Sequence, residues 1–334
     1  MLRRNYSLVR LCAILILNRI LVVRGGAIGD FILTLPALKA LRDAFPRTHI
    51  DILGYKHIAA LAEKRFYAQA VRSIEYGPLS SFFAKNSEQS AELANYFASF
   101  DLIISYLYDP DRIFENNLRR CGVENLVCGP AKIDNSDHAA RQLARPIEEL
   151  GIEVVDLSAK IFPSAEDRQF AQDFLSDLPL PIVAIHPGSG SERKNWPVKN
   201  WIALSRSDGF PAVVISGEAD ESQTAQLEIA WKDRAVRFAR ALPLPQLAAV
   251  LENTIFVGHD SGISHLAAAA GANCILLFGP TDPAVWAPKN KNVRVIRAPD
   301  GDLRNLDVDV VRDLASDPIA GMFMSILEGE LGDS

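Results

Sequence analysis

A glycine-rich turn near the N-terminus carries an acidic residue whose placement suggests chemistry. Gly25, Gly26 and Gly29 follow the apolar run Ile20–Val23, and Asp30 stands directly after them, where an apolar, helix-like stretch begins. Glycine lets a backbone approach a ligand closely. A carboxylate at a helix start is often an N-cap, but beside a bound substrate it can act as a general base. The turn therefore predicts a close backbone approach, with Asp30 as either a helix cap or a catalytic base.

A second loop combines hydroxyl, glycine and cationic side chains. It is the run HPGSGSERKNWP at 186–197, in which Ser189, Ser191, Arg193 and Lys194 lie within six residues of one another. Backbone N–H groups, hydroxyls and cations together suit an anionic ligand such as a diphosphate. The alternative is a solvated basic loop whose Trp-Pro pair closes the start of the next helix. The residues alone leave both readings open.

A third loop, FVGHDSGISH at 256–265, leads into an alanine-rich helix. Small residues at a helix start, here Ser261 and Gly262, leave N–H groups and the positive end of the helix dipole available to phosphate oxygens. Asp260 beside an anion site requires an explanation, and we expect its carboxylate to cap local backbone or to order the turn. His265 is either a ligand donor or a core residue, and we favour the donor.

Several well-known site patterns are missing from the sequence. Arg24 stands where a G-x-G-x-x-G fingerprint ending at Gly29 would need its first glycine, so a dinucleotide site is disfavoured. The chain has no H-E-x-x-H, paired CxxC, P-loop or G-x-S-x-G motif. The run FGPTDP at 278–283 is by itself a proline-rich turn. We therefore expect phosphate to be held by main chain, lysine and arginine, with no metal and no other cofactor.

The composition is that of a globular enzyme of about two domains. The 334 residues are 49% hydrophobic and 23% charged, which excludes disordered, collagen-like and coiled-coil proteins. The net charge of −6 disfavours a nucleic-acid-binding protein. Residues 1–150 carry +3 and residues 151–334 carry −9, so the first half is the better host for an anionic partner. Four cysteines form no disulfide framework, which favours a reducing cytosol.

Short apolar runs alternate with amphipathic stretches along the chain, as in the βα units of a parallel sheet. Two such series are visible, joined between about Phe162 and Pro181. We expect an extension at 1–18 and doubly wound domains at 19–163 and 164–334, with a C-terminal helix that can pack back on the first domain. Expected strands are Ile20–Val23, His49–Leu53, Leu102–Tyr106, Ile182–His186, Ala212–Ser216, Thr254–Gly258 and Cys274–Phe278. Expected helices begin near Asp30, Glu88, Asp111, Ser136 and Ala165, and after Pro197, Asp220 and Ser261.

The first residues resemble the charged and apolar regions of a signal peptide. Arg3 and Arg4 precede the apolar stretch Leu8–Leu17, which is too short to span a membrane and has no small-residue cleavage site after it. The segment is therefore either a dispensable extension or a contact to a membrane surface. We expect a cytoplasmic protein, with the inner face of the cytoplasmic membrane as the surface for any peripheral contact.

Four runs together resemble glycosyltransferase family 9, the ADP-heptose:lipopolysaccharide heptosyltransferases. They are GGAIGDFILTLPALKALRDAFP at 25–46, HPGSGSERKNWP at 186–197, VGHDSGISHLAAAAG at 257–271 and FGPTDP at 278–283. The resemblance implies a GT-B architecture, in which two Rossmann-like domains face each other across a cleft. It also implies that the first domain binds the acceptor, that the second binds the nucleotide-sugar, and that the sugar is transferred with inversion and without a metal.

The resemblance also assigns roles by position. Asp30 matches the aspartate proposed as general base, and Lys194 matches a lysine near the diphosphate. Glu221 is the best match to the glutamate on the ribose, with Glu218 close by. The phosphate-holding D-[TS]-G-x-x-H loop is matched by Asp260, Ser261, Gly262 and His265. The 186–197 loop is richer in serine and glycine than the threonine-containing loops of the family, which leaves the donor sugar and nucleobase open.

The expected activity is transfer of heptose or a related sugar from an ADP-sugar to a lipopolysaccharide core or another cell-surface glycan. The partners are thus a nucleotide-sugar and a glycan or glycolipid acceptor. No run identifies a lipid A or Kdo site; Arg24, Lys56, Arg112, Arg119 and Arg120 are either contacts to an anionic acceptor or ordinary surface charges. Three alternatives remain: a non-catalytic nucleotide-sugar-binding protein, a sugar-nucleotide epimerase of the same fold, and a peripheral membrane scaffold.

Overall fold

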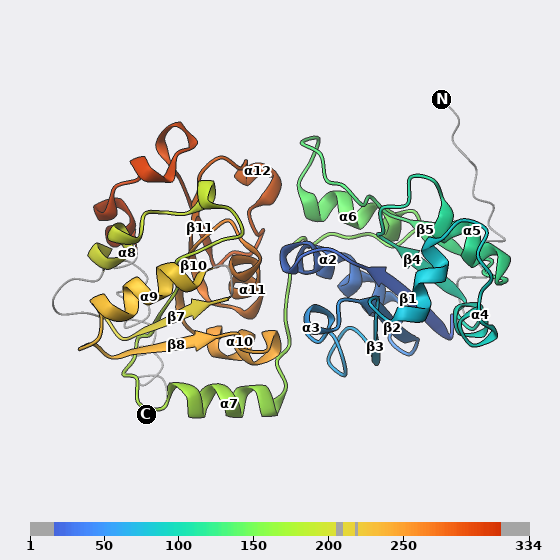
Figure 1. Ribbon diagram of the computed structural model, residues 1–334, viewed down its shortest axis with the longest axis horizontal. Coiled ribbons are helices and arrows are strands. Elements are labelled where there is room, and N and C mark those ends of the chain that lie inside the picture. The colour runs from blue at the N-terminus through green and yellow to red at the C-terminus, as the bar shows by residue number, and fades with distance from the viewer. Residues whose placement is uncertain (1–16, 205–209, 218–219, 315–334) are drawn as a thin grey trace, which may run out of the picture. The chain divides into compact units, whose positions relative to one another are not determined.

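The chain forms two compact units (Figure 1). The computed structural model describes residues 17–204, 210–217 and 220–314. The first unit contains the described residues up to 27 together with 33–157, and the second contains 28–32 and the described residues from 158 onward. The first sixteen residues and the C-terminal helix considered above lie outside the described part. The predicted domain limits at 18/19 and 163/164 stay predictions.

The first unit is built on a five-stranded parallel sheet with the order β3-β2-β1-β4-β5. Its central strand is almost fully buried because helices cover both faces, as is usual for a parallel sheet. The strands are β1 (Arg19–Arg24), β2 (His49–Gly54), β3 (Ala70–Ser73), β4 (Leu102–Ser105) and β5 (Leu126–Cys128). The helices are α2 (Ile28–Ala44), α3 (Lys56–Ala59), α4 (Ala91–Ala98), α5 (Ile113–Arg120), α6 (Ala139–Glu148) and the 3-10 helix η2 (Gly77–Phe83).

The second unit is built on a six-stranded parallel sheet with the order β11-β10-β9-β6-β7-β8. Its strands are β6 (Val183–His186), β7 (Ala212–Ser216), β8 (Val236–Arg240), β9 (Ile255–His259), β10 (Asn273–Phe278) and β11 (Val293–Arg297). Its helices are α7 (Ala165–Leu175), α8 (Val198–Leu204), α9 (Glu221–Ala230), α10 (Leu244–Leu251), α11 (Gly262–Ala270) and α12 (Pro283–Trp286), with 3-10 turns η3 (Glu192–Lys194), η5 (Pro299–Gly301) and η6 (Leu303–Asn305).

Each unit has its own hydrophobic core. In the first unit an aromatic cluster packs under the sheet, with the Phe82 and Phe97 ring centroids 4.6 Å apart. In the second, Trp196 and Trp201 meet edge to face at 5.1 Å, and both side chains are fully buried. Aromatic pairs of this kind add to the stabilisation that burial alone provides.

The predicted α/β class with two parallel sheets is confirmed, and all seven expected strands are present to within about a residue. The expected helices are also present, with starts shifted by up to three residues. Four strands were missed: β3, β5, β8 and β11. No helix of the described residues is long and apolar enough to cross a membrane.

In each sheet the strand order reverses once. The reversal lies between β1 and β4 in the first unit and between β6 and β9 in the second. Loops leave the sheet in opposite directions at such a point, so a crevice opens outside the carboxyl ends of the two strands, and ligands of doubly wound folds bind there. The two reversal points are therefore the places to look for function.

Candidate active site

The reversal point of the second sheet brings the second and third sequence motifs together. Strands β6 and β9 pair in parallel, with His186 opposite Gly258, so the loops that follow both strands leave the same edge side by side. One loop is 187–195 and the other begins at Asp260. The sequence motifs at 186–197 and 256–265 are thus neighbours in space although they are about seventy residues apart in the chain.

An ion pair ties these two loops together. Lys194 Nζ donates to Asp260 Oδ2 at 2.7 Å, and the side chains are 29% and 9% exposed. Thr281 Oγ1, from the loop after β10, donates to the same oxygen at 2.8 Å. Asp260 therefore accepts from side chains of both neighbouring loops. We expected its carboxylate either to cap local backbone or to order the turn, and these bonds agree with the second expectation.

Ser189 organises the loop after β6 from inside. Its hydroxyl donates to Asn195 Oδ1 at 2.7 Å and lies 2.9 Å from the Ser191 carbonyl oxygen, and the Ser191 N–H points back at Ser189 Oγ at 3.4 Å. The Ser189 side chain is buried, whereas Ser191 is partly exposed. A shaped loop whose N–H groups are held in place is suited to an anion, and contact of both serines with a diphosphate stays a prediction.

The start of α11 has the geometry expected from its sequence. Ser261 is the N-cap, and its Oγ accepts from the Ser264 N–H at 3.3 Å. Gly262 is the first helical residue, and N–H groups at that position have no acceptor within the helix. His265 lies in the first turn with its side chain 5% exposed. Burial alone does not separate the ligand-donor and core readings of His265, so its role stays a prediction.

A buried His–Asp pair behind this helix start was missed by the sequence analysis. His186, the last residue of β6, places Nε2 2.8 Å from Asp220 Oδ2. Burial acts to raise the pKa of Asp220, but the hydrogen bonds from His186 and from the Gly217 N–H act against it, and the pKa is lowered overall. The carboxylate packs so closely on Gly188 that a Cβ built there would lie 1.9 Å from Asp220 Oδ1. Gly188 is therefore a site where no side chain fits.

A second histidine is held in its neutral form. His259, at the end of β9, is fully buried, and this burial together with neighbouring His186 lowers its pKa to about 3. Its Nε2 accepts from the Trp196 N–H at 2.8 Å, which a protonated ring could not do. The bond fastens the end of the 187–195 loop to β9.

Glu221, the predicted ribose ligand, is the first residue of α9 and is exposed. Its position at a helix start, close to the carboxyl end of β7, is compatible with contact to a ligand at the reversal point. Glu218, the competing match, lies outside the described residues. The structure thus describes only one of the two glutamates.

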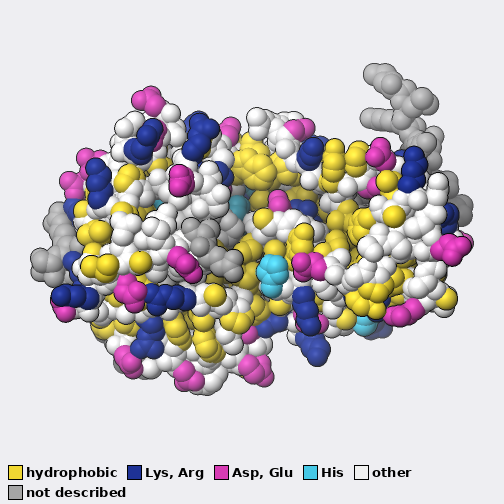
Figure 2. Space-filling model, in the orientation of Figure 1, with side chains coloured by type: hydrophobic (Ala, Val, Ile, Leu, Met, Phe, Trp, Pro, Cys, Tyr) yellow, Lys and Arg dark blue, Asp and Glu magenta, His cyan; other side chains and the backbone are white. Residues whose placement is uncertain are grey.

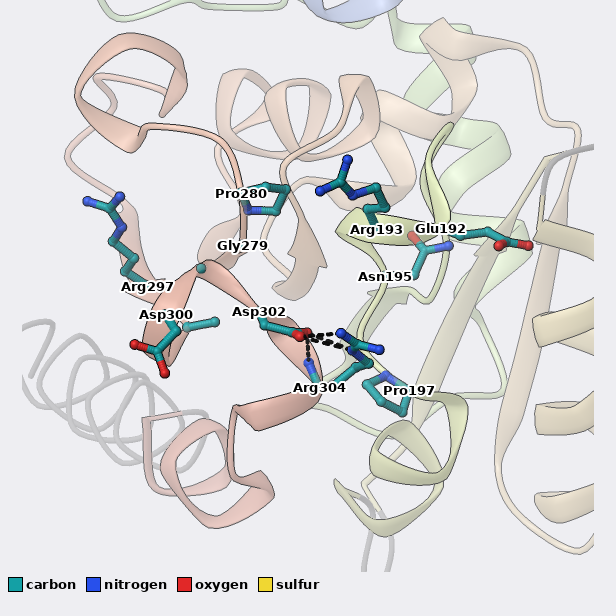
Figure 3. A pocket seen from close by; sticks show the side chains of 12 residues that line it. Glu192, Arg193, Asn195, Pro197, Gly279, Pro280, Arg297, Asp300, Asp302 and Arg304 are labelled. Carbon is teal, nitrogen blue, oxygen red and sulfur yellow. Dashed lines mark hydrogen bonds and ion pairs between the residues drawn. The ribbon is translucent and has the colours of Figure 1, made fainter.

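Arg193 lines a pocket of about 1070 Å³ next to this loop (Figure 3). The other walls come from the loops after β10 and β11, including Arg297 and the Asp302–Arg304 ion pair, whose shortest separation is 2.6 Å. None of the other predicted diphosphate ligands lines the pocket. Arg193 and its neighbour Lys194 therefore have different surroundings. Lys194 is bound to Asp260, and Arg193 faces a pocket of mixed charge.

The first motif follows β1 at the reversal point of the first sheet. Gly26 has a φ of 95°, a left-handed conformation that favours glycine, and a Cβ on Gly25 would approach Leu107 Cδ2 at 3.4 Å. Gly29 and Asp30 belong to the first turn of α2 and are partly buried. These two residues group with the second compact unit, so Asp30 lies in the same unit as the loops described above.

Four of the five basic residues named as possible acceptor contacts make internal bonds. The Arg24 side chain is buried and donates from Nε to Thr34 Oγ1 at 2.9 Å. Arg112 forms a two-pronged pair with Glu115. Arg119 and Arg120 donate to backbone carbonyls, and Lys56 is exposed. Arg24 is thus bonded inside the fold, and contact of any of the five with an acceptor stays a prediction.

The charges on the surface are mixed. On the face shown in Figure 2, acidic and basic side chains alternate across the second unit, in spite of its excess of acidic residues.

Among the described residues, no three His, Cys, Asp or Glu side chains are grouped as a metal site would require.

A sequence model described as glycosyltransferase family 9 (heptosyltransferase) matches residues 136–309. The chain belongs to glycosyltransferase family 9. The matched segment holds both loops of the second reversal point, whereas Asp30 lies outside it. The resemblance stated from the four sequence runs is thereby confirmed, and the protein is a glycosyltransferase.

Individual relatives align with nearly the whole chain. Lipopolysaccharide heptosyltransferase 1 of Escherichia coli K12 is 26% identical over 89% of this chain and 99% of its own length. Lipopolysaccharide heptosyltransferase 3 of Escherichia coli is 24% identical over 85% and 90%. Among solved structures, a family 9 glycosyltransferase of Veillonella parvula has a TM-score of 0.74 at 19% identity, covering 90% of this chain and 96% of its own. E. coli ADP-heptose lps heptosyltransferase II has a TM-score of 0.72 at 16% identity, covering 92% and 99%. These structures share the GT-B fold.

Proposed function

We propose that this protein transfers heptose, or a closely related sugar, from an ADP-sugar to a lipopolysaccharide core or another cell-surface glycan. The observation that carries the proposal is the meeting of Lys194, Asp260 and the start of α11 at the reversal point of the second sheet. Among the similar solved structures are those of E. coli heptosyltransferase WaaC with ADP and with ADP-2-deoxy-2-fluoro heptose. The nucleotide-sugar is the donor and the glycan or glycolipid is the acceptor.

The donor diphosphate would be held by main chain and one ion-paired lysine. Lys194 supplies the positive charge, and Asp260 fixes where that charge sits. The first N–H groups of α11, beside Ser261 and Gly262, lie at the positive end of the helix dipole. We also place Ser189, Ser191 and His265 around this diphosphate, with Arg193 reaching it from the side of the pocket that it lines, and Glu221 on the ribose.

The chemical step is a direct displacement at the anomeric carbon. Asp30 accepts the proton of the acceptor hydroxyl as that oxygen forms the new bond, and the bond to the nucleoside diphosphate breaks on the opposite face of the sugar. The result is inversion. The departing negative charge is stabilised by Lys194 and the α11 N–H groups, without a metal ion, because the donors are already in place before the reaction. Gly25, Gly26 and Gly29 let the backbone that carries Asp30 approach the substrate.

Calorimetric titration of the protein with ADP, UDP, GDP and ADP-heptose tests the donor. Selective binding of ADP and ADP-heptose, followed by transfer of heptose to a lipopolysaccharide-core acceptor, supports the proposal. Preference for another nucleotide would keep the transferase and discard heptose. Binding of no nucleotide would contradict the donor assignment and favour a different role for the fold.

We further propose that the protein is cytoplasmic and touches the inner face of the cytoplasmic membrane through residues 1–18. A short apolar stretch behind two arginines is suited to lie in an anionic membrane surface. Flotation with anionic vesicles should recover the full chain and leave a variant lacking residues 1–18 in solution. Equal recovery of both would place the membrane contact elsewhere or remove it.

A further inference from the structure

Three side chains form a line behind the start of α11. His186 Nε2 lies 2.8 Å from Asp220 Oδ2, and their side chains are 6% and 4% exposed. The other ring nitrogen of His186, Nδ1, lies 3.4 Å from Ser261 Oγ. The line thus runs from the residue before α9, through the end of β6, to the hydroxyl that we place at the donor diphosphate.

The Asp220 carboxylate determines which nitrogen of His186 carries the proton. The pKa of Asp220 is lowered by His186, although burial alone would raise it, so the carboxylate is ionised at neutral pH. An ionised carboxylate can only accept hydrogen bonds. The proton of the neutral His186 ring must therefore sit on Nε2, which leaves Nδ1 as an acceptor facing Ser261.

The single proton of Ser261 is already committed to the protein interior. Ser261 Oγ accepts from the Ser264 N–H at 3.3 Å and faces two acceptors, His186 Nδ1 at 3.4 Å and Ser264 Oγ at 3.2 Å. Ser264 donates its own proton to the His259 carbonyl, so towards Ser261 it can only accept. In this state Ser261 presents lone pairs, rather than a proton, to an arriving anion.

We propose that His186 and Asp220 are positioning residues for Ser261, and that the donor diphosphate binds at Ser261 together with one proton, which His186 takes up on Nδ1. The doubly protonated ring then donates to Ser261 Oγ, and the Ser261 proton turns toward a phosphate oxygen. The proposal rests on the proposed function, because it concerns the same nucleotide site. It adds a coupling between nucleotide binding and protonation.

The surrounding charges favour a proton on His186 over one on His259. His259 is fully buried with its pKa lowered to about 3, so it stays neutral. The charge of Asp260 is paired with Lys194. Asp220 keeps a full negative charge 2.8 Å from the His186 ring, and the incoming diphosphate adds more. The titratable groups around the line are Asp220, His259, Asp260, Lys194 and His265.

Titration calorimetry of the full chain with ADP measures the coupling directly. The heat is compared in two buffers of different ionisation enthalpy near pH 8, where a terminal phosphate that titrates near pH 6 is already ionised. We expect a net uptake of a measurable fraction of one proton per ADP bound. We also expect the Kd for ADP to rise with pH in the alkaline range, by up to about tenfold per pH unit, because binding takes up a proton.

Matched variants at Ser261 separate this coupling from any other proton exchange. Ser261→Ala should bind ADP without proton uptake, whereas Ser261→Thr keeps the hydroxyl and should keep the uptake. Asp220→Asn should also abolish it, because a neutral amide does not stabilise a charged ring; the Ser261 pair carries the test if Asp220→Asn fails to fold. ADP binding without proton uptake in the unchanged protein, or equal uptake in Ser261→Ala, overturns the inference and leaves the proposed function intact. No ADP binding at all overturns both.

Discussion

Lys194 Nζ lies 2.7 Å from Asp260 Oδ2, so the cation that we assign to the donor diphosphate is already bound to a carboxylate before any ligand arrives. Thr281 holds the same oxygen at 2.8 Å. A diphosphate must share this lysine with a nearly buried negative charge. The arrangement favours accurate placement of the lysine over maximal attraction for the ligand.

Lys194→Ala should weaken ADP binding by about 10- to 100-fold, roughly 1.4–2.8 kcal/mol, because it removes a cation and also leaves the Asp260 carboxylate facing the diphosphate without its partner. Adding Asp260→Asn should recover about half of that free energy, since the uncompensated charge is removed as well. Calorimetric titration of the four proteins completes the double-mutant cycle. Additive effects would show that the pair does not act as a unit. Arg193→Ala removes a positive charge from the same loop without breaking an ion pair to Asp260, so it should cost less than Lys194→Ala.

Asp30→Asn should abolish sugar transfer while leaving the Kd for ADP within about twofold, because an amide cannot accept the acceptor's proton yet keeps the size of the side chain. Turnover of ADP-heptose with a lipopolysaccharide-core acceptor, measured beside ADP titration, checks this. Asp43→Asn is the matched control: Asp43 lies near the other end of α2, pairs with Lys39 on the surface, and should leave turnover unchanged. Loss of ADP binding in Asp30→Asn would remove Asp30 from the role of base.

Gly188→Ala should lower the free energy of unfolding by about 2 kcal/mol, because the new methyl group would overlap Asp220 and the buried carboxylate would have to move. Gly190→Ala, two residues along the same loop, should change it by less than about 0.5 kcal/mol, since nothing lies within 4 Å of its Cβ. Urea unfolding of both variants decides the point. Equal stabilities would mean that Asp220 yields at little cost.

Stability should fall as the pH drops below about 6.5. His259 has a pKa of about 3 in the folded protein, below the ordinary histidine value of 6.5, so protons bind more tightly to the unfolded chain. The contribution of His259 is complete above pH 6.5 and is lost toward pH 3, at up to about 1.4 kcal/mol per pH unit. His259→Gln can still accept from the Trp196 N–H but does not titrate. Urea unfolding at several pH values should therefore give a flatter profile for His259→Gln, and parallel profiles would contradict the assignment.

The sequence was sufficient for the strands that are buried on both faces. Runs such as Ile20–Val23 and Ala212–Ser216 are almost continuously apolar, which is how a central strand of a parallel sheet reads. The four strands that were missed are the two edges of each sheet. They are only partly buried, as β3 and β11 illustrate, and the charged residues that protect an edge from pairing also hide it from a search for apolar runs.

The loops of the candidate site could be predicted because each contains a short sequence motif. Contacts between residues far apart in the sequence could not. Glycine and serine beside a strand end marked the loops at 187–195 and 260–265. Asp220 gave no such signal, since an acid before a helix looks like a cap, yet its side chain makes no cap hydrogen bond and turns to His186 instead. Those two residues are 34 positions apart, and only the parallel register of the sheet brings them together.

Gly188 and Asp220 occupy adjoining volumes so completely that the two positions cannot change independently over evolution. A lineage that loses the carboxylate at position 220 gains room for a side chain at position 188. The opposite order passes through an intermediate with two groups in one space. In related proteins that carry a side chain at position 188, we therefore expect the aspartate at position 220 to have been replaced first. The close packing of the two residues thus fixes the order of the two substitutions.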